Sequence, residues 1–508
     1  MYFKQDAGFL CGCLRIARIF LYPSFLSFNW LLCLYITTFQ ENKNPSNILK
    51  RKIFLTPIYA SLFILFLPLM IIFLPLRCLL LYYRRPFMCS EHHTAYTHWQ
   101  SQILNEKIDS GDHKFGIATA NLCLMPELAS KMNDLTNVSR RAKKIGERIV
   151  VNQFYNDEWS KSESSLKNPA SNKNVDGKFL TNVSGSGDGN NRGKQKKHED
   201  IQGIVSTNFP FVDIFVIQEA WSSYHNPTLM QELHKVFPYI IHDAGVHSYE
   251  NNLFFLNSGL LIASRHPIVA VDFKPFVNFV KHGRLLSNGL LMAKVVIGRE
   301  KSEKRHVGYI FNTHLQSYQG KDQIIPKQLD EMLAWIKLFK EENKQKGDNI
   351  IFSIICGDFN FDNFSPADKE SSRHPVFSEF TDFGRLKAGL DKPWTVGTEM
   401  RPEFMLEKEV ATPERLKFVL EDPILRQCHL VDADILEHSK EAIVSGGVKR
   451  DAEGKVIVFP EGGRRRIDYI LTNDFYPVNV ESYSFVTKLA LLTDHIPVAM
   501  SFTCQNLK

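Results

Sequence analysis

The sequence predicts an α/β protein built as a layered sandwich, with two hydrophobic membrane segments ahead of it. Many short apolar runs have the composition of buried β-strands, and most of them end in polar residues. Helical patterns are few and the connections between strands vary in length, which is typical of layered α/β folds. The chain of 508 residues is long enough for a large core and for roughly two to four domains.

Composition narrows the class of protein. The formal net charge of +6 is mild for this length, so it permits contact with anionic surfaces without requiring nucleic acid as a partner. The nine cysteines follow no repeating spacing, which argues against a disulfide framework and against a zinc site. A reducing compartment is therefore expected.

Residues 1–90 form the predicted membrane-anchoring region. The stretches 19–39 and 53–76 contain no charged residue, and each is long enough to cross a bilayer core, which takes roughly 20 residues. The first is too long for a secretory signal peptide, and no small-residue cleavage site follows it before Glu41. Prolines in both stretches also permit a re-entrant hairpin that returns to the same face of the membrane.

Basic residues flank both ends of each stretch, so the positive-inside rule does not order the loops, which agrees with a hairpin kept on one side. The catalytic part is expected to face the cytosol, and the flanking charges should attract anionic phospholipids. The organelle stays open among plasma membrane or Golgi, endoplasmic reticulum and mitochondrion. Four cysteines near the stretches are candidates for S-acylation, with plain thiols as an equal alternative: Cys11, Cys13, Cys78 and Cys89.

The rest of the chain is predicted as a connector at 91–110 and a catalytic domain at 111–505. A disordered insertion, rich in Asn, Ser, Gly and Lys, interrupts that domain at 152–198. Apolar spacing predicts helices at 139–150, with Ser139 at its start, and at 322–341. Polar loops are expected from about residue 363 to about 460.

Six strand-like runs have polar residues at or beside their ends. They are 114–124 with Asn121, 213–219 with Glu219, 307–315 with His314, 350–362 with Asp358 and Asn360, 466–471 with Asp468, and 493–500 with Asp494 and His495. Two further runs, 259–264 and 289–296, read as plain strands.

The run at 350–362 ends abruptly in Gly357-Asp358-Phe359-Asn360. Gly357 allows a close backbone turn, and on a locally extended chain Asp358 and Asn360 would point to the same side. A carboxylate beside a carboxamide can orient water or metal and hold a phosphoryl oxygen. An ordinary strand ending in an Asx turn explains this pattern about as well.

Each polar strand end, taken alone, has a structural explanation as a turn former, a loop charge or a satisfied core histidine. Strand tips are nevertheless where a rigid scaffold gathers side chains into one pocket. Six such ends in one chain therefore predict a single catalytic site. Carboxylate and amide oxygens suit a hard divalent cation, and a histidine near its ordinary pKa suits proton transfer at neutral pH.

These motifs resemble those of the endonuclease/exonuclease/phosphatase superfamily, which has the fold of pancreatic deoxyribonuclease. The resemblance follows the order Ala-Asn-Leu, Gln-Glu, Thr-His-Leu, Gly-Asp-Phe-Asn, Arg-Ile-Asp-Tyr and Thr-Asp-His-Ile-Pro-Val. The chain is more narrowly similar to the membrane-bound neutral sphingomyelinases of vertebrates. That similarity rests on the segments at 54–59, 256–261, 356–363 and 392–394, and on the two hydrophobic stretches.

The resemblance implies a four-layered α/β sandwich and hydrolysis of sphingomyelin to ceramide and phosphocholine, with Mg²⁺ as cofactor and Mn²⁺ as an alternative. Glu219 would be the main metal ligand, with Asn121 and Asp494 on the metal side. His495 would be the general base, oriented by Asp468. The resemblance also gives roles to three further residues, in positioning water or binding phosphoryl oxygens: Asp358, Asn360 and His314.

One departure from that family affects regulation. Relatives carry an Asp and, five residues later, a Lys just before the Gly-Leu-Leu strand, where this chain has Gly283 and Asn288. A switch built on such a pair would be absent, unless Lys281 or Arg284 substitutes for it. The change also keeps open a catalytically impaired membrane scaffold.

Two other kinds of hydrolase with the same core fit the sequence less well. A nuclease would want a groove rich in Arg and aromatic residues, and two apolar anchors with modest charge argue against nucleic acid. An inositol-polyphosphate phosphatase would carry an Arg after Gly-Asp-Phe-Asn, where this chain has Phe361-Asp362. A phosphodiesterase acting on lysophospholipid remains an alternative.

Overall fold

The catalytic part of the chain is a sandwich of two β-sheets in a computed structural model. The structure describes residues 8–92, 114–153, 203–222, 224–249, 252–299, 304–317, 323–433, 451–455, 457–459 and 461–504. The predicted connector at 91–110 and the predicted insertion at 152–198 lie almost wholly outside the described residues.

The first sheet has eight strands in the order β1-β5-β8-β4-β2-β18-β17-β3. Its two central strands, β2 and β4, run parallel, so both end at the same edge. The strands are β1 (Met88–Glu91), β2 (Lys114–Asn121), β3 (Gly203–Ser206), β4 (Ile214–Gln218), β5 (Tyr239–His242), β8 (Leu261–Ser264), β17 (Val478–Val486) and β18 (Val498–Cys504).

The second sheet has six strands in the order β13-β16-β12-β11-β10-β9. Its central pair β11 and β12 is also parallel, and β12 pairs with β16 in the antiparallel sense. The strands are β9 (Ile268–Pro275), β10 (Gly289–Arg299), β11 (Arg305–His314), β12 (Asp348–Asp358), β13 (Phe380–Asp382) and β16 (Asp468–Asn473). Two small hairpins are formed by β6 (Ser248–Tyr249) with β7 (Asn252–Leu253) and by β14 (Arg385–Lys387) with β15 (Leu390–Asp391).

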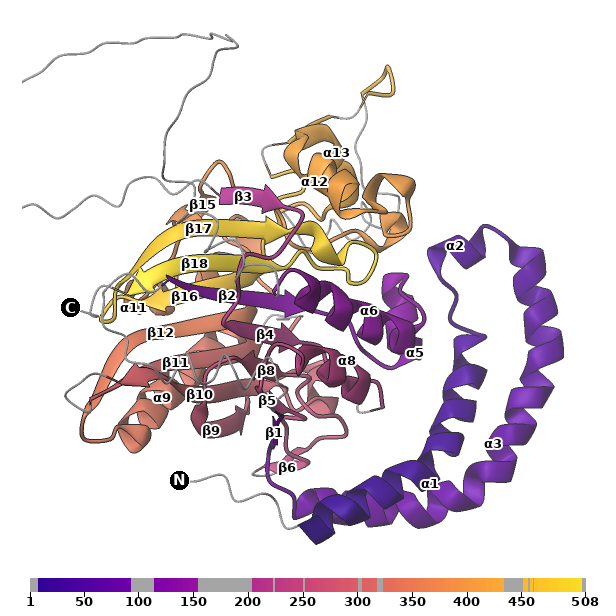
Figure 1. Ribbon diagram of the computed structural model, residues 1–508. Coiled ribbons are helices and arrows are strands. Elements are labelled where there is room, and N and C mark those ends of the chain that lie inside the picture. The colour runs from indigo at the N-terminus through magenta and orange to yellow at the C-terminus, as the bar shows by residue number, and fades with distance from the viewer. Residues whose placement is uncertain are drawn as a thin grey trace, which may run out of the picture.

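Three apolar clusters separate four layers. One cluster fills the space between the sheets and includes Phe115 and Phe352, whose rings lie edge to face at 5.8 Å. A second lies between the first sheet and helices α6 (Val138–Val151) and α8 (Asn226–Leu233). A third lies between the second sheet and helix α9 (Ile324–Asn343). The predicted four-layered α/β sandwich is confirmed (Figure 1).

Shorter helical turns fill the connections. They are α5 (Glu127–Ser130), η1 (Lys131–Asn133), η2 (Lys281–Leu285), η3 (Pro366–Asp368), α10 (Lys369–Ser372), α11 (Val376–Glu379), η4 (Pro402–Phe404), η5 (Lys408–Val410), α12 (Pro413–Glu421), α13 (Pro423–His429) and η6 (Thr487–Leu489).

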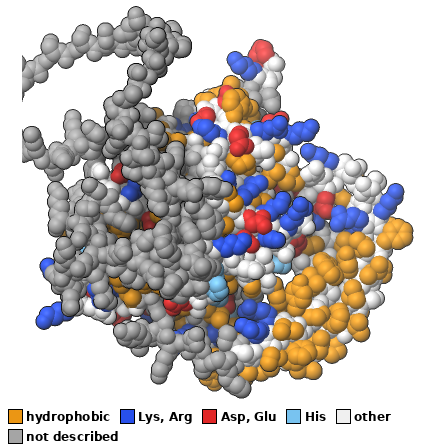
Figure 2. All heavy atoms as spheres, viewed as in Figure 1, with side chains coloured by type: hydrophobic (Ala, Val, Ile, Leu, Met, Phe, Trp, Pro, Cys, Tyr) orange, Lys and Arg blue, Asp and Glu red, His pale blue; other side chains and the backbone are white. Residues whose placement is uncertain are grey.

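The N-terminal region is an antiparallel pair of long helices, α1 (Gly8–Cys33) and α3 (Pro45–Tyr82), joined through the short α2 (Phe39–Asn42). Phe20 stacks on Phe73 at 4.5 Å near the middle of α1, and Trp30 lies against Tyr59 at 5.5 Å near the end of α1. Both helices are long and apolar enough to cross a membrane. Large hydrophobic side chains cover the outer side of this hairpin (Figure 2).

The hairpin is attached to the sandwich at both of its ends. At its base, Arg84 and Arg18 form ion pairs with Asp243, which follows β5. At its tip, Lys131 of η1 lies 2.8 Å from Glu41, and the Phe39 N–H donates to Asp134 at 2.7 Å. The hairpin therefore arches beside one flank of the sandwich instead of projecting away from it (Figure 1).

The first apolar helix differs from the predicted stretch at 19–39. Helix α1 begins at Gly8 and ends at Cys33, because the chain turns there into α2. Thr38 and Glu41 form a capping box that starts this new helix, with the Thr38 hydroxyl accepting from the Glu41 N–H at 3.0 Å. The second segment is longer than predicted and contains Pro57, Pro68 and Pro75, which remove backbone hydrogen bonds and favour the curvature in Figure 1.

The polar loops predicted up to about 460 contain more structure than expected. Helices α12 and α13 lie there and start on the side chains of Thr412 and Asp422, which accept backbone N–H groups. Strands β9 and β17 were also missed, and β17 has exposed residues alternating with buried ones in its first half. Ser139 is not the start of α6, because Asn137 occupies the cap position.

Candidate active site

The predicted site residues gather at one end of the sandwich because the central strands of both sheets end there. β2 ends at Asn121 and β4 leads into Glu219, while β11 ends at His314 and β12 at Asp358. Asp468 starts β16 and is paired in register with Asp358. Asp494 and His495 lie in the turn just before β18 rather than inside the predicted strand.

Hydrogen bonds connect the two sheets through this group. Asn121 of the first sheet donates through Nδ2 to Oδ2 of Asp358 in the second sheet, at 2.9 Å. The same Nδ2 lies 3.4 Å from Nε2 of His495. Nε2 of His314 lies 3.5 Å from Asp358 Oδ2, so this carboxylate oxygen is the centre of the cluster.

His495 and Asp468 form a buried pair. Nδ1 of His495 lies 2.8 Å from Oδ2 of Asp468, and the Asp468 N–H donates to the Thr398 hydroxyl at 3.2 Å. Burial lowers the pKa of His495, but the Asp468, Asp358 and Asp494 carboxylates outweigh this and hold it well above 6.5. Because Nδ1 is engaged with Asp468, Nε2 is the ring nitrogen that faces Asn121 and Asp358.

Glu219 is held in an uncommon backbone conformation, with φ at +58° directly after β4. Its Oε1 lies 3.9 Å from His314 Nε2, whereas its buried Oε2 has no hydrogen-bond donor among the described residues. Burial, together with the nearby Asp494 and Asp358 carboxylates, raises the pKa of Glu219 to about 8. Carboxylates therefore crowd together here, and the His495 charge offsets them only in part.

The Gly-Asp-Phe-Asn turn combines both interpretations drawn from its sequence. A side chain at Gly357 would come within 2.0 Å of the Thr313 carbonyl, so the close approach predicted for this glycine is confirmed. Oδ1 of Asp358 accepts from the Asn360 N–H at 2.9 Å, which is an Asx turn, while Oδ2 takes part in the cluster. The extended chain predicted at Asn360 is wrong, because its φ is +52°.

Asn360 uses one of its amide hydrogens within the protein. Nδ2 donates to the Leu315 carbonyl at 2.9 Å, next to His314. The guanidinium of Arg465 lies behind it and donates to the Asn360 carbonyl at 3.3 Å and to Asp362 at 3.1 Å. Arg465 was not predicted as a site residue, and only its position two residues before Ile467-Asp468 could have pointed to it.

A second residue missed by sequence reasoning is Asn133. It lies at the end of η1, and its Nδ2 donates to Oδ2 of Asp494 at 2.5 Å and to Cys123 Sγ at 3.7 Å. η1 also carries Lys131, which contacts the tip of the N-terminal hairpin. A three-residue turn gives no strand-end pattern, so the sequence held no signal for this contact.

The cluster fits a divalent cation on two grounds. Glu219 has an unpartnered carboxylate oxygen, and the surrounding donors are carboxylate and amide oxygens, which hard cations prefer. The ligand atoms of Asp358, Asp468 and His495 also lie within 4.8 Å of one another. Two of these three residues already bond each other through His495 Nδ1, so the Glu219 side offers the freer oxygens.

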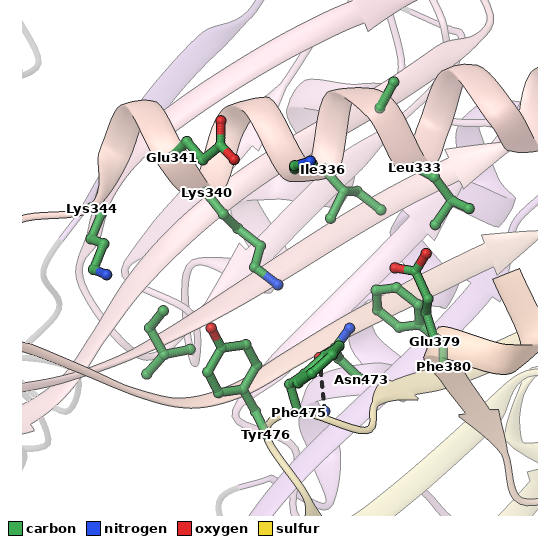
Figure 3. Close-up of a pocket in the computed structure, with 13 residues that line it drawn as sticks. Leu333, Ile336, Lys340, Glu341, Lys344, Glu379, Phe380, Asn473, Phe475 and Tyr476 are labelled. Carbon is green, nitrogen blue, oxygen red and sulfur yellow. Dashed lines mark hydrogen bonds between the residues drawn. The ribbon is translucent and has the colours of Figure 1, made fainter.

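A separate groove of about 470 Å³ lies far from this cluster. It is bounded by α9 on one side and by Asn473, Phe475 and Tyr476 at the end of β16 on the other (Figure 3). Ile350 in its wall is near the start of β12, whereas Asp358 is at the other end of that strand. At about 3.3 Å per residue, the groove and the polar cluster are roughly 26 Å apart.

Comparison with known proteins identifies the class that the fold and cluster define. The family model described as "Endonuclease/Exonuclease/phosphatase family" matches residues 174–495. The chain is 30% identical to sphingomyelin phosphodiesterase 5 of Danio rerio, over 97% of this chain and 96% of that protein. It is 35% identical to human sphingomyelin phosphodiesterase 3, over 60% of this chain and 47% of that protein. The chain belongs to the endonuclease/exonuclease/phosphatase family.

Within that family, the relatives it matches along almost its full length or in its catalytic part are sphingomyelin phosphodiesterases. Solved structures similar to this chain include sphingomyelinase C from Streptomyces griseocarneus, at 13% identity and a TM-score of 0.38, over 77% of this chain and 99% of that one. A mutant of beta toxin from Staphylococcus aureus with bound magnesium ions matches at 14% identity and a TM-score of 0.40, over 77% of this chain and 100% of that one.

Proposed function

We propose that this chain is a membrane-attached, Mg²⁺-dependent phosphodiesterase that hydrolyses sphingomyelin to ceramide and phosphocholine. The observation that carries the proposal is the pairing of two features in one cluster. A carboxylate cluster centred on Glu219, whose Oε2 has no hydrogen-bond donor among the described residues, lies beside a buried His495–Asp468 pair. Similarity along nearly the whole chain to a sphingomyelin phosphodiesterase supports the choice of substrate.

His495 is the general base in this proposal. Asp468 accepts a hydrogen bond from the Nδ1–H and fixes the ring orientation, so Nε2 is the atom that would take a proton from the attacking water. A bound cation would offset the carboxylates that hold the His495 pKa well above 6.5, and so would leave Nε2 free to act as a base. Asp358 lies 3.8 Å from that Nε2 and can hold the water through its carboxylate. The second amide hydrogen of Asn360 and Nε2 of His314 are the donors for the phosphoryl oxygens, where negative charge develops.

Glu219, Asn121 and Asp494 are the residues that would hold the metal ion, with Mn²⁺ as an alternative to Mg²⁺. A bound divalent cation would neutralise charge on the phosphodiester. Asn133 donates to Asp494 and thereby keeps that carboxylate in place beside Glu219. Arg465 has the same kind of positioning role for the Asn360 turn.

The hairpin supports attachment to one face of a membrane. Its base is bonded to Asp243 and its tip to Lys131 and Asp134, so both ends belong to the same side of the sandwich. A re-entrant or in-plane hairpin satisfies these contacts, whereas two complete spans would put the tip across the bilayer. We propose that the catalytic part faces the cytosol and that anionic phospholipids bind the flanking basic residues. Cys78 and Cys89 are exposed and remain candidates for S-acylation.

The test uses the full-length chain with Mg²⁺ in mixed micelles that contain sphingomyelin and phosphatidylserine. Release of phosphocholine is expected, and His495→Ala and Asp468→Asn should each reduce the rate by about 10²–10⁴-fold. A second histidine–aspartate pair offers a matched control outside the site. His374 Nε2 lies 3.1 Å from Asp330, and His374→Ala and Asp330→Asn should retain activity.

Phosphatidylcholine, lysophospholipid and DNA complete the substrate panel. Faster hydrolysis of lysophospholipid than of sphingomyelin would move the assignment to that substrate. Equal rates in the wild type and in His495→Ala would overturn the mechanism.

A further inference from the structure

The catalytic sandwich carries an exposed apolar surface of its own, outside the membrane hairpin. Four side chains, which we call the loop patch, form it from two segments, the end of β7 with the residues after it and the end of η2. They are Leu253 (71% exposed), Phe255 (74%), Leu256 (38%) and Leu285 (49%). Exposed apolar clusters of this kind mark contact surfaces more often than isolated exposed residues do.

The backbone holds these side chains outward. The N–H groups of Phe255 and Leu256 both donate to the Leu285 carbonyl at 3.0 Å. The Ser287 N–H in turn donates to the Leu256 carbonyl at 3.1 Å. Beneath this bridge, Phe254 is buried and packs edge to face on Phe279 at 5.8 Å. The alternation of buried Phe254 and exposed Phe255 therefore follows from a fixed, paired segment.

The loop patch is continuous with the base of the hairpin. Asn257, two residues after Phe255, donates to Oδ1 of Asp243 at 2.6 Å, and the other oxygen of Asp243 pairs with Arg84 and Arg18. The Ser287 hydroxyl accepts from the Val246 N–H at 3.0 Å on the same side. Figure 1 shows β6, which pairs with β7, beside the lower end of α1 and α3.

The loop patch also adjoins the active site. Gln316 lies two residues beyond His314, and its amide bonds Val280 twice, to the N–H at 3.3 Å and to the carbonyl at 3.2 Å. Val280 directly precedes η2. Gly283 of η2 has no side chain, and a Cβ there would come within 2.3 Å of Gln316 Oε1. The segment that presents Leu285 is thus fixed to the strand that supplies His314.

Charge around the loop patch matches an anionic lipid surface. Lys281 and Arg284 are exposed on η2 beside Leu285, and Arg85 is exposed at the end of the hairpin. Tyr82 and Tyr83, which are exposed at the C-terminal end of α3, are of the residue type that concentrates at membrane interfaces. Apolar side chains within a basic and aromatic border are typical of surfaces that enter the headgroup region of a bilayer.

We propose that the loop patch inserts into the same leaflet as the hairpin and holds the active-site entrance against the lipid surface. The occupant is a bilayer containing anionic phospholipid. The inference rests on the proposed function for its lipid substrate, but insertion itself can be measured without catalysis.

The first experiment measures insertion. The full-length chain carrying Phe255→Trp is reconstituted in phosphatidylcholine and phosphatidylserine vesicles, with and without brominated phosphatidylcholine. The matched control is Phe475→Trp, because Phe475 is 79% exposed and borders the distant groove of Figure 3. Quenching above the wild-type background is expected for Phe255→Trp and absent for Phe475→Trp. Equal quenching of the two variants would overturn the proposal. The proposal would also be overturned if the Phe255→Trp protein sedimented as a dimer without vesicles and its new tryptophan were shielded from solvent, since a second copy would then cover the patch.

The second experiment measures the consequence for catalysis. Phe255→Ser should lower kcat/KM about tenfold on sphingomyelin in vesicles, since lost apolar contact weakens interfacial binding. It should leave the rate on a monomeric, short-chain sphingomyelin unchanged, and Phe475→Ser should match wild type on both substrates. Loss on both substrates would mean that Phe255 acts on the site itself, and unchanged rates on both would mean that the patch does not hold the site to lipid. Wild-type protein that hydrolyses neither substrate would refute the proposed function, while the quenching result would stand apart from it.

Discussion

Replacing Glu219 with Gln should make the cation-free protein more stable while removing its response to Mg²⁺. Burial and the Asp494 and Asp358 carboxylates raise the pKa of Glu219 from 4.5 to about 8 in the folded chain. A raised pKa means that stability is complete below pH 4.5 and is lost as the pH rises toward 8. pH 7 is 2.5 units above 4.5, and at about 1.4 kcal/mol per unit the folded state has lost about 3–4 kcal/mol. Gln cannot ionise and should recover an amount of this order.

Urea unfolding of the full-length chain in detergent, with EDTA or with saturating Mg²⁺, measures both effects. Wild type should gain about 2.7 kcal/mol in Mg²⁺ at 100 times the dissociation constant, and Glu219→Gln should gain nothing. Glu232→Gln is the control, because Glu232 of α8 pairs with Lys235, outside the site, and this variant should keep the full Mg²⁺ response. A Glu219→Gln protein that is less stable than wild type in EDTA, yet still stabilised by Mg²⁺, would refute the reasoning.

Two further predictions concern stability away from the site. Burial lowers the pKa of His242 to about 4. The unfolding free energy should therefore fall by about 3 kcal/mol as the pH falls from 6.5 to 4. Urea unfolding of His242→Gln should show a smaller loss over the same pH range. The buried Arg466 guanidinium pairs with Asp382 and Asp391, so Asp382→Ala should cost about 3 kcal/mol of unfolding free energy by leaving it underpaired. An exposed pair, Lys143 with Glu147, is the comparison, and Glu147→Ala should change that free energy by less than about 1 kcal/mol. Equal losses in the two alanine variants would contradict the burial argument.

The strand ends were predictable because a buried strand is a continuous apolar run in the sequence, and the polar residue at its end is easily recognised. Asn121, Glu219, His314 and Asp358 were found in this way, and the structure brings them together because parallel strands share an edge. The four-layered architecture followed from the same runs and from the family resemblance.

Features that depend on tertiary contacts were not predictable. Asn133 reaches Asp494 from a three-residue turn 361 positions away along the chain, and no local pattern marks such a contact. The sequence left open whether the chain at Asn360 is extended or forms an Asx turn, because both use the same residues, and the structure has the Asx turn with Asn360 left-handed. Strand β17 has a polar, alternating first half, which resembles a loop until its pairing with β18 is known.

The two bonds at the centre of the site cross between the sheets. Asn121 to Asp358 and His495 to Asp468 each join a residue of the eight-stranded sheet, or of the turn leading into it, to one of the six-stranded sheet. Turnover therefore depends on tight packing of the apolar core between the two sheets. In a molten globule, where strands persist but side-chain packing loosens, both bonds break while far-ultraviolet circular dichroism stays near its native value. Heat or mild acid should therefore abolish turnover before the strands melt.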